Sequence, residues 1–273
     1  MVSQVRAGAH HTGAEGRAAE AHYNLASHPS FGCKPVVPFV SKPAPPLWLF
    51  DLDNTLHDAS HAIFPAISAN MNVYIARVLG ENGVPATQAA VDAARLGYWK
   101  RYGATLLGMM RHHAVLPAHF LHETHDLADL LGMVKAERGL GRLLRSLPGR
   151  KILLTNAPTR YSTDVLHHLR LARRFDHHIA IEDMHVHRQL RPKPSTLMLR
   201  RLLRKHRADP RRCILVEDTL DNLRGAKRLG MRTVWVTQYL RTGRVVKRPG
   251  YVDVKVKSVR QLGTRLRALG ALR

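Results

Sequence analysis

The sequence has few cysteines and no long hydrophobic run. Its 273 residues include two cysteines, Cys33 and Cys213, and neither has a partner at a zinc-ligand spacing or belongs to a disulfide framework. No apolar stretch approaches the roughly 20 residues that a membrane-spanning helix needs. The N-terminus also lacks the basic start and apolar run of a secretory signal. We therefore expect a protein of the reducing cytoplasm without a membrane partner.

Acidic and aromatic residues are also scarce. The chain has 20 Asp and Glu against 43 Lys and Arg, which gives a net charge of +23, and only 6% of its residues are aromatic. Such an excess predicts attraction to anions, from phosphorylated metabolites to nucleic acid. Modules that stack nucleic-acid bases need aromatic rings. A generally basic surface is therefore favoured over a nucleic-acid site, which stays the alternative, and nothing indicates an oligomeric state.

Short apolar runs alternate with helical stretches after a Pro-rich leader, residues 1–46, which we expect to be mobile. Runs of this kind are typical of strands buried on both faces. The predicted strands are Trp48–Phe50, Lys151–Leu154, His178–Ile181, Cys213–Val216 and Thr233–Val236. The predicted helices between the later strands are Tyr161–Arg170, Ser195–His206 and Leu220–Leu229. The alternation predicts an α/β fold with a Rossmann-like, doubly wound parallel sheet. Tyr251–Val256 is predicted as a late edge strand, followed by a basic amphipathic helix.

A long insertion separates the first two predicted strands. Residues 51–150 lie between them, where a crossover connection needs about a dozen. The helical stretches expected there are Ile63–Leu79, Thr87–Lys100, Ala104–His113, Ala118–His125 and Glu137–Leu147. We expect residues 58–145 to form a helical cap on a catalytic core of residues 47–57 and 146–273. A cap in this position can close over a site at the strand ends.

Two carboxylates follow the first strand directly. Asp51 and Asp53 lie in residues 51–56 (Asp-Leu-Asp-Asn-Thr-Leu). Open α/β folds place their chemistry at the carboxyl ends of such strands. Because two close carboxylates repel each other unless a cation lies between them, the pair suits a nucleophile, a proton donor and a hard metal ion. The alternative is an ordinary acidic turn.

Further polar groups follow the later strands. Thr155 and Asn156 end the second strand, Lys193 lies between two prolines, and Glu217 and Asp218 end the fourth. Taken singly, Thr155 and Asp218 are also explained as helix caps, and Lys193 as an exposed turn lysine. Their order, each at a strand end or in a stiff loop, predicts one shared site.

This order of motifs resembles the haloacid dehalogenase superfamily of phosphohydrolases. The resemblance implies that Asp51 is the nucleophile, which becomes a transient aspartyl phosphate. It implies that Asp53 is the general acid and then activates water. Thr155 would bind the phosphate, and Lys193 would balance its charge. A dehalogenase has no leaving alkoxide to protonate, so an acid at position 53 favours phosphate ester hydrolysis.

The same resemblance implies a Mg²⁺ site. Asp51, Asp218 and the backbone carbonyl of Asp53 would hold the ion. Glu217 and Asn222 would contact the ligands of the ion or reach the ion through water, and Asp221 could take either of these roles instead. Hard Mg²⁺ prefers oxygen ligands, and no Cys or His accompanies these carboxylates.

The cap sequence narrows the expected substrate. Residues 98–109 (Tyr-Trp-Lys-Arg-Tyr-Gly-Ala-Thr-Leu-Leu-Gly-Met) resemble the cap signature of pyrimidine 5′-nucleotidases. Rings four residues apart share a helix face and suit a nucleobase. The expected substrate contacts are Tyr98, Arg101, Tyr102, Asn156 and His57. The alternative for the aromatic residues is that they form the core of the cap.

The predicted function is that of a Mg²⁺-dependent phosphatase acting on nucleoside 5′-monophosphates, with pyrimidines preferred. The first alternative keeps the chemistry and changes the substrate to a sugar phosphate, phosphoglycolate or a phosphomutase intermediate. The second is a non-catalytic basic protein that binds RNA or other anions, and it depends on the net charge of +23.

Histidine clusters offer a different metal chemistry. His119, His122 and His125 recur every three residues, and His185 and His187 would face one way in an extended strand. Either set suits a transition metal. Because the predicted chemistry needs no such metal, surface histidines are the plainer interpretation.

Overall fold

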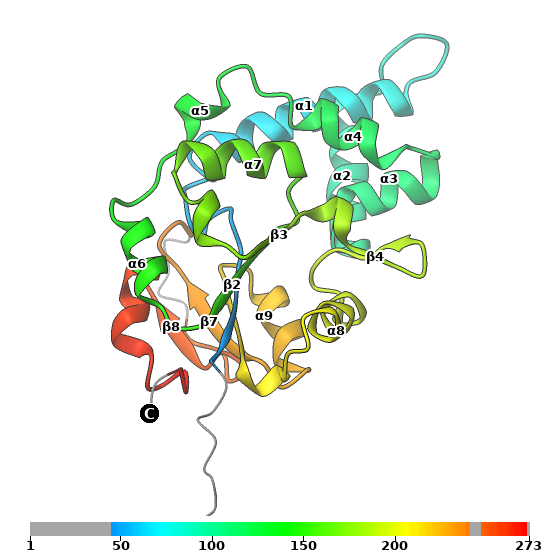
Figure 1. The fold of residues 1–273 in the computed structure, drawn as a ribbon. Helices are drawn as coiled ribbons and strands as arrows, with labels where there is room; N and C mark the ends of the chain where they lie inside the picture. The colour runs from blue at the N-terminus through cyan, green and yellow to red at the C-terminus, as the bar shows by residue number, and fades with distance from the viewer. Residues whose placement is uncertain (1–44, 241–246, 272–273) are drawn as a thin grey trace, which may run out of the picture. The chain divides into compact units, whose positions relative to one another are not determined.

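The computed structural model describes residues 45–240 and 247–271, so almost all of the predicted leader and Cys33 lie outside the described residues. Its main sheet has six parallel strands in the order β3-β2-β1-β6-β7-β8 (Figure 1). The strands are β1 (Leu47–Phe50), β2 (Arg150–Leu154), β3 (His177–Ile179), β6 (Cys213–Glu217), β7 (Arg232–Val236) and β8 (Val254–Val256). The predicted parallel α/β sheet is confirmed. Its chain order reverses beside β1, and this is where such sheets place their ligands.

The side chains of β1 alternate between the two buried faces of the sheet. In β1, Leu47 and Leu49 join one hydrophobic cluster, while Trp48 and Phe50 join the other. Successive side chains of a strand point to opposite faces, so a strand buried on both must be apolar throughout. All four residues of β1 are buried. This strand therefore forms the centre of the core.

Helices cover both faces of the sheet, as a doubly wound fold requires. The first cluster takes in the apolar sides of α8 (Thr196–Lys205) and α9 (Leu220–Lys227). The second takes in α6 (Leu140–Ser146) and α7 (Thr159–His168). In Figure 1, α8 lies to the right of the sheet, and α6 with the red C-terminal segment lies to its left. The sheet is thus enclosed between two helical layers.

The C-terminal segment differs from the prediction. Residues Val259–Arg265 form the 3₁₀-helix η4, not an amphipathic α-helix. The buried side chains here include Val259 and Leu262, three residues apart, followed by Leu266 and Leu269, also three apart. Val259 and Leu262 lie within η4 and share a face at its three residues per turn, whereas Leu266 and Leu269 follow the end of this helix.

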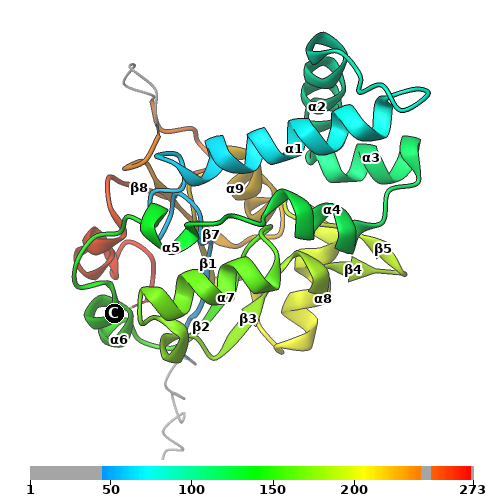
Figure 2. The same ribbon diagram turned by 90° about the horizontal axis from the view of Figure 1, so that it is seen from above.

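Helices occupy the long insertion. They are α1 (Ile63–Leu79), α2 (Gln88–Tyr102), α3 (Thr105–His113), α4 (Pro117–Thr124) and the short, unpredicted α5 (Leu130–Met133), followed by α6. Helix α1 packs against α2 and α4, and α2 packs against α3, whereas α6 packs against η4. Figure 2 shows α2 and α3 at the end of α1 away from α6. The division into core and cap stays a prediction. Within the described ranges, no helix has the length and apolar character that crossing a bilayer demands.

A small hairpin was not predicted. Strands β4 (His185–Val186) and β5 (Gln189–Leu190) pair antiparallel. His187 and Arg188 form the turn, with φ of 50° and 62°. Two successive residues with positive φ are typical of a tight type I′ hairpin turn. His187 is therefore a turn residue, so His185 and His187 do not lie in one extended strand and do not face one way as they would there.

Candidate active site

Three strand ends bring the predicted motifs to one edge of the sheet. Strand β1 lies between β2 and β6, and Phe50 is level with Leu153 on one side and Val216 on the other. The amide of Asp51 continues this pairing by donating to the carbonyl of Val216 at 3.0 Å. Asp51 therefore leaves the sheet beside the ends of β2 and β6.

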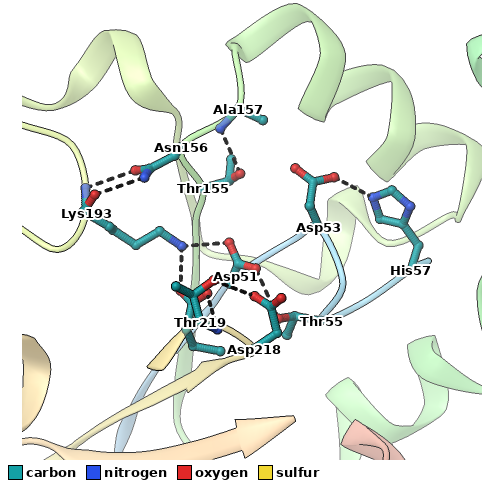
Figure 3. Close-up of polar contacts among 11 residues, drawn as sticks. Asp51, Asp53, Thr55, His57, Thr155, Asn156, Ala157, Lys193, Asp218 and Thr219 are labelled. Carbon is teal, nitrogen blue, oxygen red and sulfur yellow. Dashed lines mark hydrogen bonds and ion pairs between the residues drawn. The ribbon is translucent and has the colours of Figure 1, made fainter. Parts of the chain in front are cut away.

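Lys193 joins two of these carboxylates. Its Nζ donates to Oδ1 of Asp51 at 2.6 Å and to Oε2 of Glu217 at 2.7 Å (Figure 3). The side chain is almost fully buried. Burial alone would lower the pKa of Lys193, but the charges of Asp51 and Glu217 raise it above its ordinary value. The ammonium group is therefore a permanent cation against Asp51.

Asn156 holds the Lys193 loop. Its Nδ2 donates to the carbonyl of Lys193 at 3.0 Å, and its Oδ1 accepts from the amide of Lys193 at 2.9 Å. In this structure the predicted substrate contact thus has both ends of its amide bonded to the backbone. On the other side, a Cβ atom at Gly225 of α9 would lie 2.7 Å from the carbonyl oxygen of Pro194. A glycine is needed at this position because the loop passes so close to the helix.

Two hydroxyl groups lie beside Asp51 and at the end of β2. Thr55 Oγ1 donates to Oδ2 of Asp51 at 3.0 Å, a contact that was not predicted. Thr155 is buried, and its Oγ1 accepts from the amide of Ala157 at 3.0 Å. Within the described residues the Thr155 hydroxyl donates to no acceptor. Its O–H is therefore free for an oxygen of another molecule.

Asp51, Glu217 and Asp218 form a compact carboxylate cluster. One oxygen from each lies within 4.8 Å of the others. Burial raises the pKa of Asp51 to about 7, and the nearby Glu217 adds to this. Burial likewise raises the pKa of Glu217 to about 7 and that of Asp218 to about 6. A cation inside the cluster would favour the ionised forms of all three.

The cluster fits a hard divalent cation. The three carboxylates carry three negative charges when all are ionised, and the ammonium of Lys193, which contacts Asp51 and Glu217, balances one of them. The donors are all oxygens, as Mg²⁺ prefers. The side-chain cluster includes Glu217, for which a supporting role was predicted. The carboxylate of Asp53 does not belong to it, and the predicted contribution of Asp53 was its backbone carbonyl.

The side chain of Asp53 points away from the cluster (Figure 3). Its Oδ1 lies 2.8 Å from Nε2 of His57 and accepts a 2.5 Å hydrogen bond from the hydroxyl of Tyr161. Burial would raise the pKa of Asp53, but the hydrogen bonds and the charge of His57 lower it below its ordinary value. His57 is fully buried and so offers no surface to a substrate in this structure. Sequence reasoning missed Tyr161, which had no signal beyond a helix start.

The residues after β6 differ in their surroundings. Asn222 is buried in the first turn of α9, but no hydrogen bond joins it to the carboxylate cluster in the described ranges. Its supporting role stays a prediction. The competing residue Asp221 is exposed and forms an ion pair with Arg224 at 3.1 Å, as surface side chains of α9 do.

The predicted aromatic pair shares one face of α2. The rings of Tyr98 and Tyr102 are 6.2 Å apart, and their hydroxyls contact His113 at 2.6 Å and His112 at 2.7 Å. The guanidinium of Arg101 lies 5.5 Å from the ring centre of Tyr102. None of the three contacts the carboxylate cluster, and their substrate contacts stay predictions.

The end of α2 nevertheless lies beside the Lys193 loop. A Cβ atom at Gly103, the residue after Tyr102, would be 3.8 Å from Cδ of Pro194. The aromatic pair is therefore on the helix end that approaches the candidate site.

The predicted histidine sets have other neighbours in the described residues. His119 contacts Tyr74 at 2.9 Å and Glu123 at 2.7 Å, and Nδ1 of His125 faces the carbonyl of Leu121 at 3.1 Å. Across the part of the chain that the structure describes, only the carboxylate cluster brings three such ligand groups together.

Solved structures share this fold. A haloacid dehalogenase superfamily phosphatase from Thermococcus onnurineus superposes with a TM-score of 0.55 at 18% identity, over 84% of this chain and 99% of that one. A candidate phosphoglycolate phosphatase from Lactobacillus plantarum superposes with a TM-score of 0.53 at 16% identity, over 84% of this chain and 100% of that one. The L-2-haloacid dehalogenase from Xanthobacter autotrophicus superposes with a TM-score of 0.50 at 14% identity, over 82% of this chain and 98% of that one. At these identities the likeness shows the fold alone.

The sequence itself matches a family model. The haloacid dehalogenase-like hydrolase model covers residues 47–230, from the start of β1 to two residues before β7. This span includes every motif of the carboxylate cluster and the Lys193 loop. The chain belongs to the haloacid dehalogenase-like hydrolase family.

Proposed function

We propose that the protein is a Mg²⁺-dependent phosphatase that hydrolyses phosphate monoesters through a phosphorylated Asp51. The observation that carries this proposal is the contact of Asp51 with a buried ammonium inside a cluster of carboxylates. Phosphoryl transfer is catalysed mainly by position and by positive charge around the transferred group. The site supplies one cation in Lys193 and has the donor set for a second.

Each residue has a specific task in this proposal. Asp51 and Asp218 would hold Mg²⁺ together with the carbonyl of Asp53, and the ion would offset the charge of the phosphoryl group. Lys193 favours the ionised form of Asp51 and holds it in position, and the free O–H of Thr155 donates to a phosphoryl oxygen. Asp53 in its protonated form donates a proton to the leaving oxygen and then accepts one from the attacking water. The hydrogen bonds in the substrate-free site lower the pKa of Asp53, and the negative charge of a bound phosphate ester beside it would raise that pKa and favour the protonated form.

The proposed substrates are nucleoside 5′-monophosphates, with pyrimidines preferred. The proposal is supported by the signature over residues 98–109 and by the position of α2 beside Pro194. A sugar phosphate or phosphoglycolate is the second candidate, favoured by the name of the neighbour from Lactobacillus plantarum. The net charge of +23 supports either anionic substrate, and a cytoplasmic location is part of the proposal.

A panel of phosphate esters tests the proposal. We expect phosphate release from UMP and CMP to exceed that from sugar phosphates and phosphoglycolate, to stop with EDTA and to return with Mg²⁺. Asp51→Asn should abolish turnover without unfolding the protein, because an amide cannot act as the nucleophile. Hydrolysis by that variant would exclude Asp51 as nucleophile, and equal rates across the panel would exclude nucleotide preference. No hydrolysis, with salt-sensitive RNA binding, would favour the non-catalytic alternative.

A further inference from the structure

Two hydrogen bonds converge on one oxygen of Asp53. The hydroxyl of Tyr161 donates to Oδ1 at 2.5 Å, and Nε2 of His57 lies 2.8 Å from the same atom. In the described part of the chain, Oδ2 of Asp53 has no hydrogen-bond partner. One carboxylate oxygen is therefore held, and the other is left for a different group.

The two groups that hold Oδ1 are themselves buried. His57 is fully buried in the turn that follows β1, and Tyr161 is buried in the first turn of α7. The ring of Tyr161 also packs edge-to-face against His125, with 5.7 Å between the ring centres. Movement of the Asp53 carboxylate away from them would leave these buried polar groups unpaired, which is unfavourable. The orientation of Asp53 is therefore imposed by its surroundings.

We propose that Tyr161 and His57 are positioning residues that hold Oδ1 of Asp53 so that Oδ2 exchanges the proton with the leaving oxygen. This inference depends on the proposed phosphatase function. In the first step the bond from Asp51 to phosphorus forms, the ester P–O bond breaks, and the proton of Asp53 passes to the departing oxygen. In the second step a water oxygen bonds to phosphorus, the bond from Asp51 breaks, and Asp53 takes a proton from that water.

Dependence on the leaving group separates this role from a purely structural one. An alkyl phosphate such as UMP needs protonation of its leaving alkoxide, whereas 4-nitrophenolate leaves as a stable anion. Because kcat/KM reports only the steps up to leaving-group departure, it isolates this proton transfer. We expect Tyr161→Phe to lower kcat/KM for UMP, or for the best alkyl ester of the panel, at least about tenfold, a fraction of the full effect of general acid catalysis. For 4-nitrophenyl phosphate the loss should stay below about twofold.

Tyr74→Phe is the matched control. Tyr74 is also buried, and its hydroxyl lies 2.9 Å from a histidine, His119, in the helical insertion. This variant should leave unchanged the ratio of kcat/KM for the alkyl ester to kcat/KM for 4-nitrophenyl phosphate. His57→Leu should lower the ratio as Tyr161→Phe does, and His57→Gln, which keeps an N–H donor, should restore part of it.

Each other outcome overturns a different statement. An equal loss of kcat/KM on both esters would make Tyr161 a structural residue, and unchanged kcat/KM values on both esters would show that Asp53 needs no such support. Either result leaves the proposed phosphatase intact. A wild-type protein that hydrolyses neither ester would overturn the proposed function and this inference with it.

Discussion

At the scale of single residues, burial sets the chemistry of the carboxylates. Asp51, Glu217 and Asp218 have raised pKa values because they are buried together, whereas Asp53 has a lowered pKa because its hydrogen bonds outweigh its burial. The pKa values of Asp51 and Asp53, two residues apart in sequence, are thus shifted in opposite directions. Carboxyl groups that favour protonation in the metal-free fold compete with a bound cation.

This competition predicts a pH-dependent effect of Mg²⁺. The three clustered carboxyls titrate near 4 when unfolded but at about 6 to 7 when folded and metal-free. The folded state therefore binds more protons, and their contribution to the free energy of unfolding falls as the pH rises from about 4 to about 7. Since Mg²⁺ needs the ionised forms, we expect it to raise the Tm more at about pH 8 than at about pH 5.5.

Differential scanning fluorimetry at constant ionic strength measures this effect. NaCl in place of MgCl₂ controls for screening, and Asp218→Asn should reduce the Mg²⁺ shift at both pH values because one ligand carboxylate is lost. A shift of equal size at both pH values, or none in the wild-type protein, would contradict the proposed cation site.

At the scale of elements, the position of the Lys193 loop depends on its fit between β2 and α9. Asn156, just after β2, bonds both backbone polar groups of Lys193, and Gly225 in α9 leaves room for Pro194. The loop carries the only cation that contacts Asp51 among the described residues. Packing between elements therefore sets the position of the cation beside Asp51, the proposed nucleophile.

A matched pair of glycine variants tests this fit. Gly225→Ala should lower the free energy of unfolding by about 1–3 kcal/mol and reduce kcat/KM, because the added methyl group meets the Pro194 carbonyl at 2.7 Å. Gly97 also lies inside a helix, α2, but has open space around it. Gly97→Ala should stabilise the protein by about 0.5–1 kcal/mol, as alanine does in a helix. Urea unfolding and ester hydrolysis measure both quantities, and a Gly225→Ala variant as stable and active as Gly97→Ala would refute the fit.

At the scale of the whole molecule, the dominant property is charge. A net charge of +23 produces a positive potential that draws anions from solution. The candidate site itself is rich in carboxylates, so this excess lies elsewhere on the chain. Its expected effect is on encounter with substrate and not on the chemical step.

We therefore predict that salt lowers kcat/KM and leaves kcat nearly unchanged. The screening length falls from about 10 Å at 0.1 M salt to about 3 Å at 1 M, so attraction of a dianionic ester to the surface weakens. Initial rates across a NaCl series at saturating and at low substrate concentrations separate the two constants. A kcat/KM that does not change with salt would show that the charge has no part in substrate capture.

Local sequence determined the elements and the order of the motifs. The all-apolar run at Trp48–Phe50 predicted a doubly buried strand, and the strand ends predicted which groups would meet, because parallel strands present their carboxyl ends at one edge. Strand and helix preferences depend on near neighbours, so a single sequence carries them. The C-terminal 3₁₀-helix and the hairpin at His187 escaped prediction because a few buried contacts and one turn decided them.

Only the tertiary structure decided which partner each site residue has. Asn156 bonds Lys193 across 37 positions, Tyr161 bonds Asp53 across 108, and Lys193 bonds Asp51 across 142. These contacts depend on strand register and on the packing of helices against the sheet, and no local preference specifies either. Residue types and their order therefore determined the family and the expected chemistry, while the folded packing determined that Asn156 supports a loop and that Tyr161 and His57 hold Asp53.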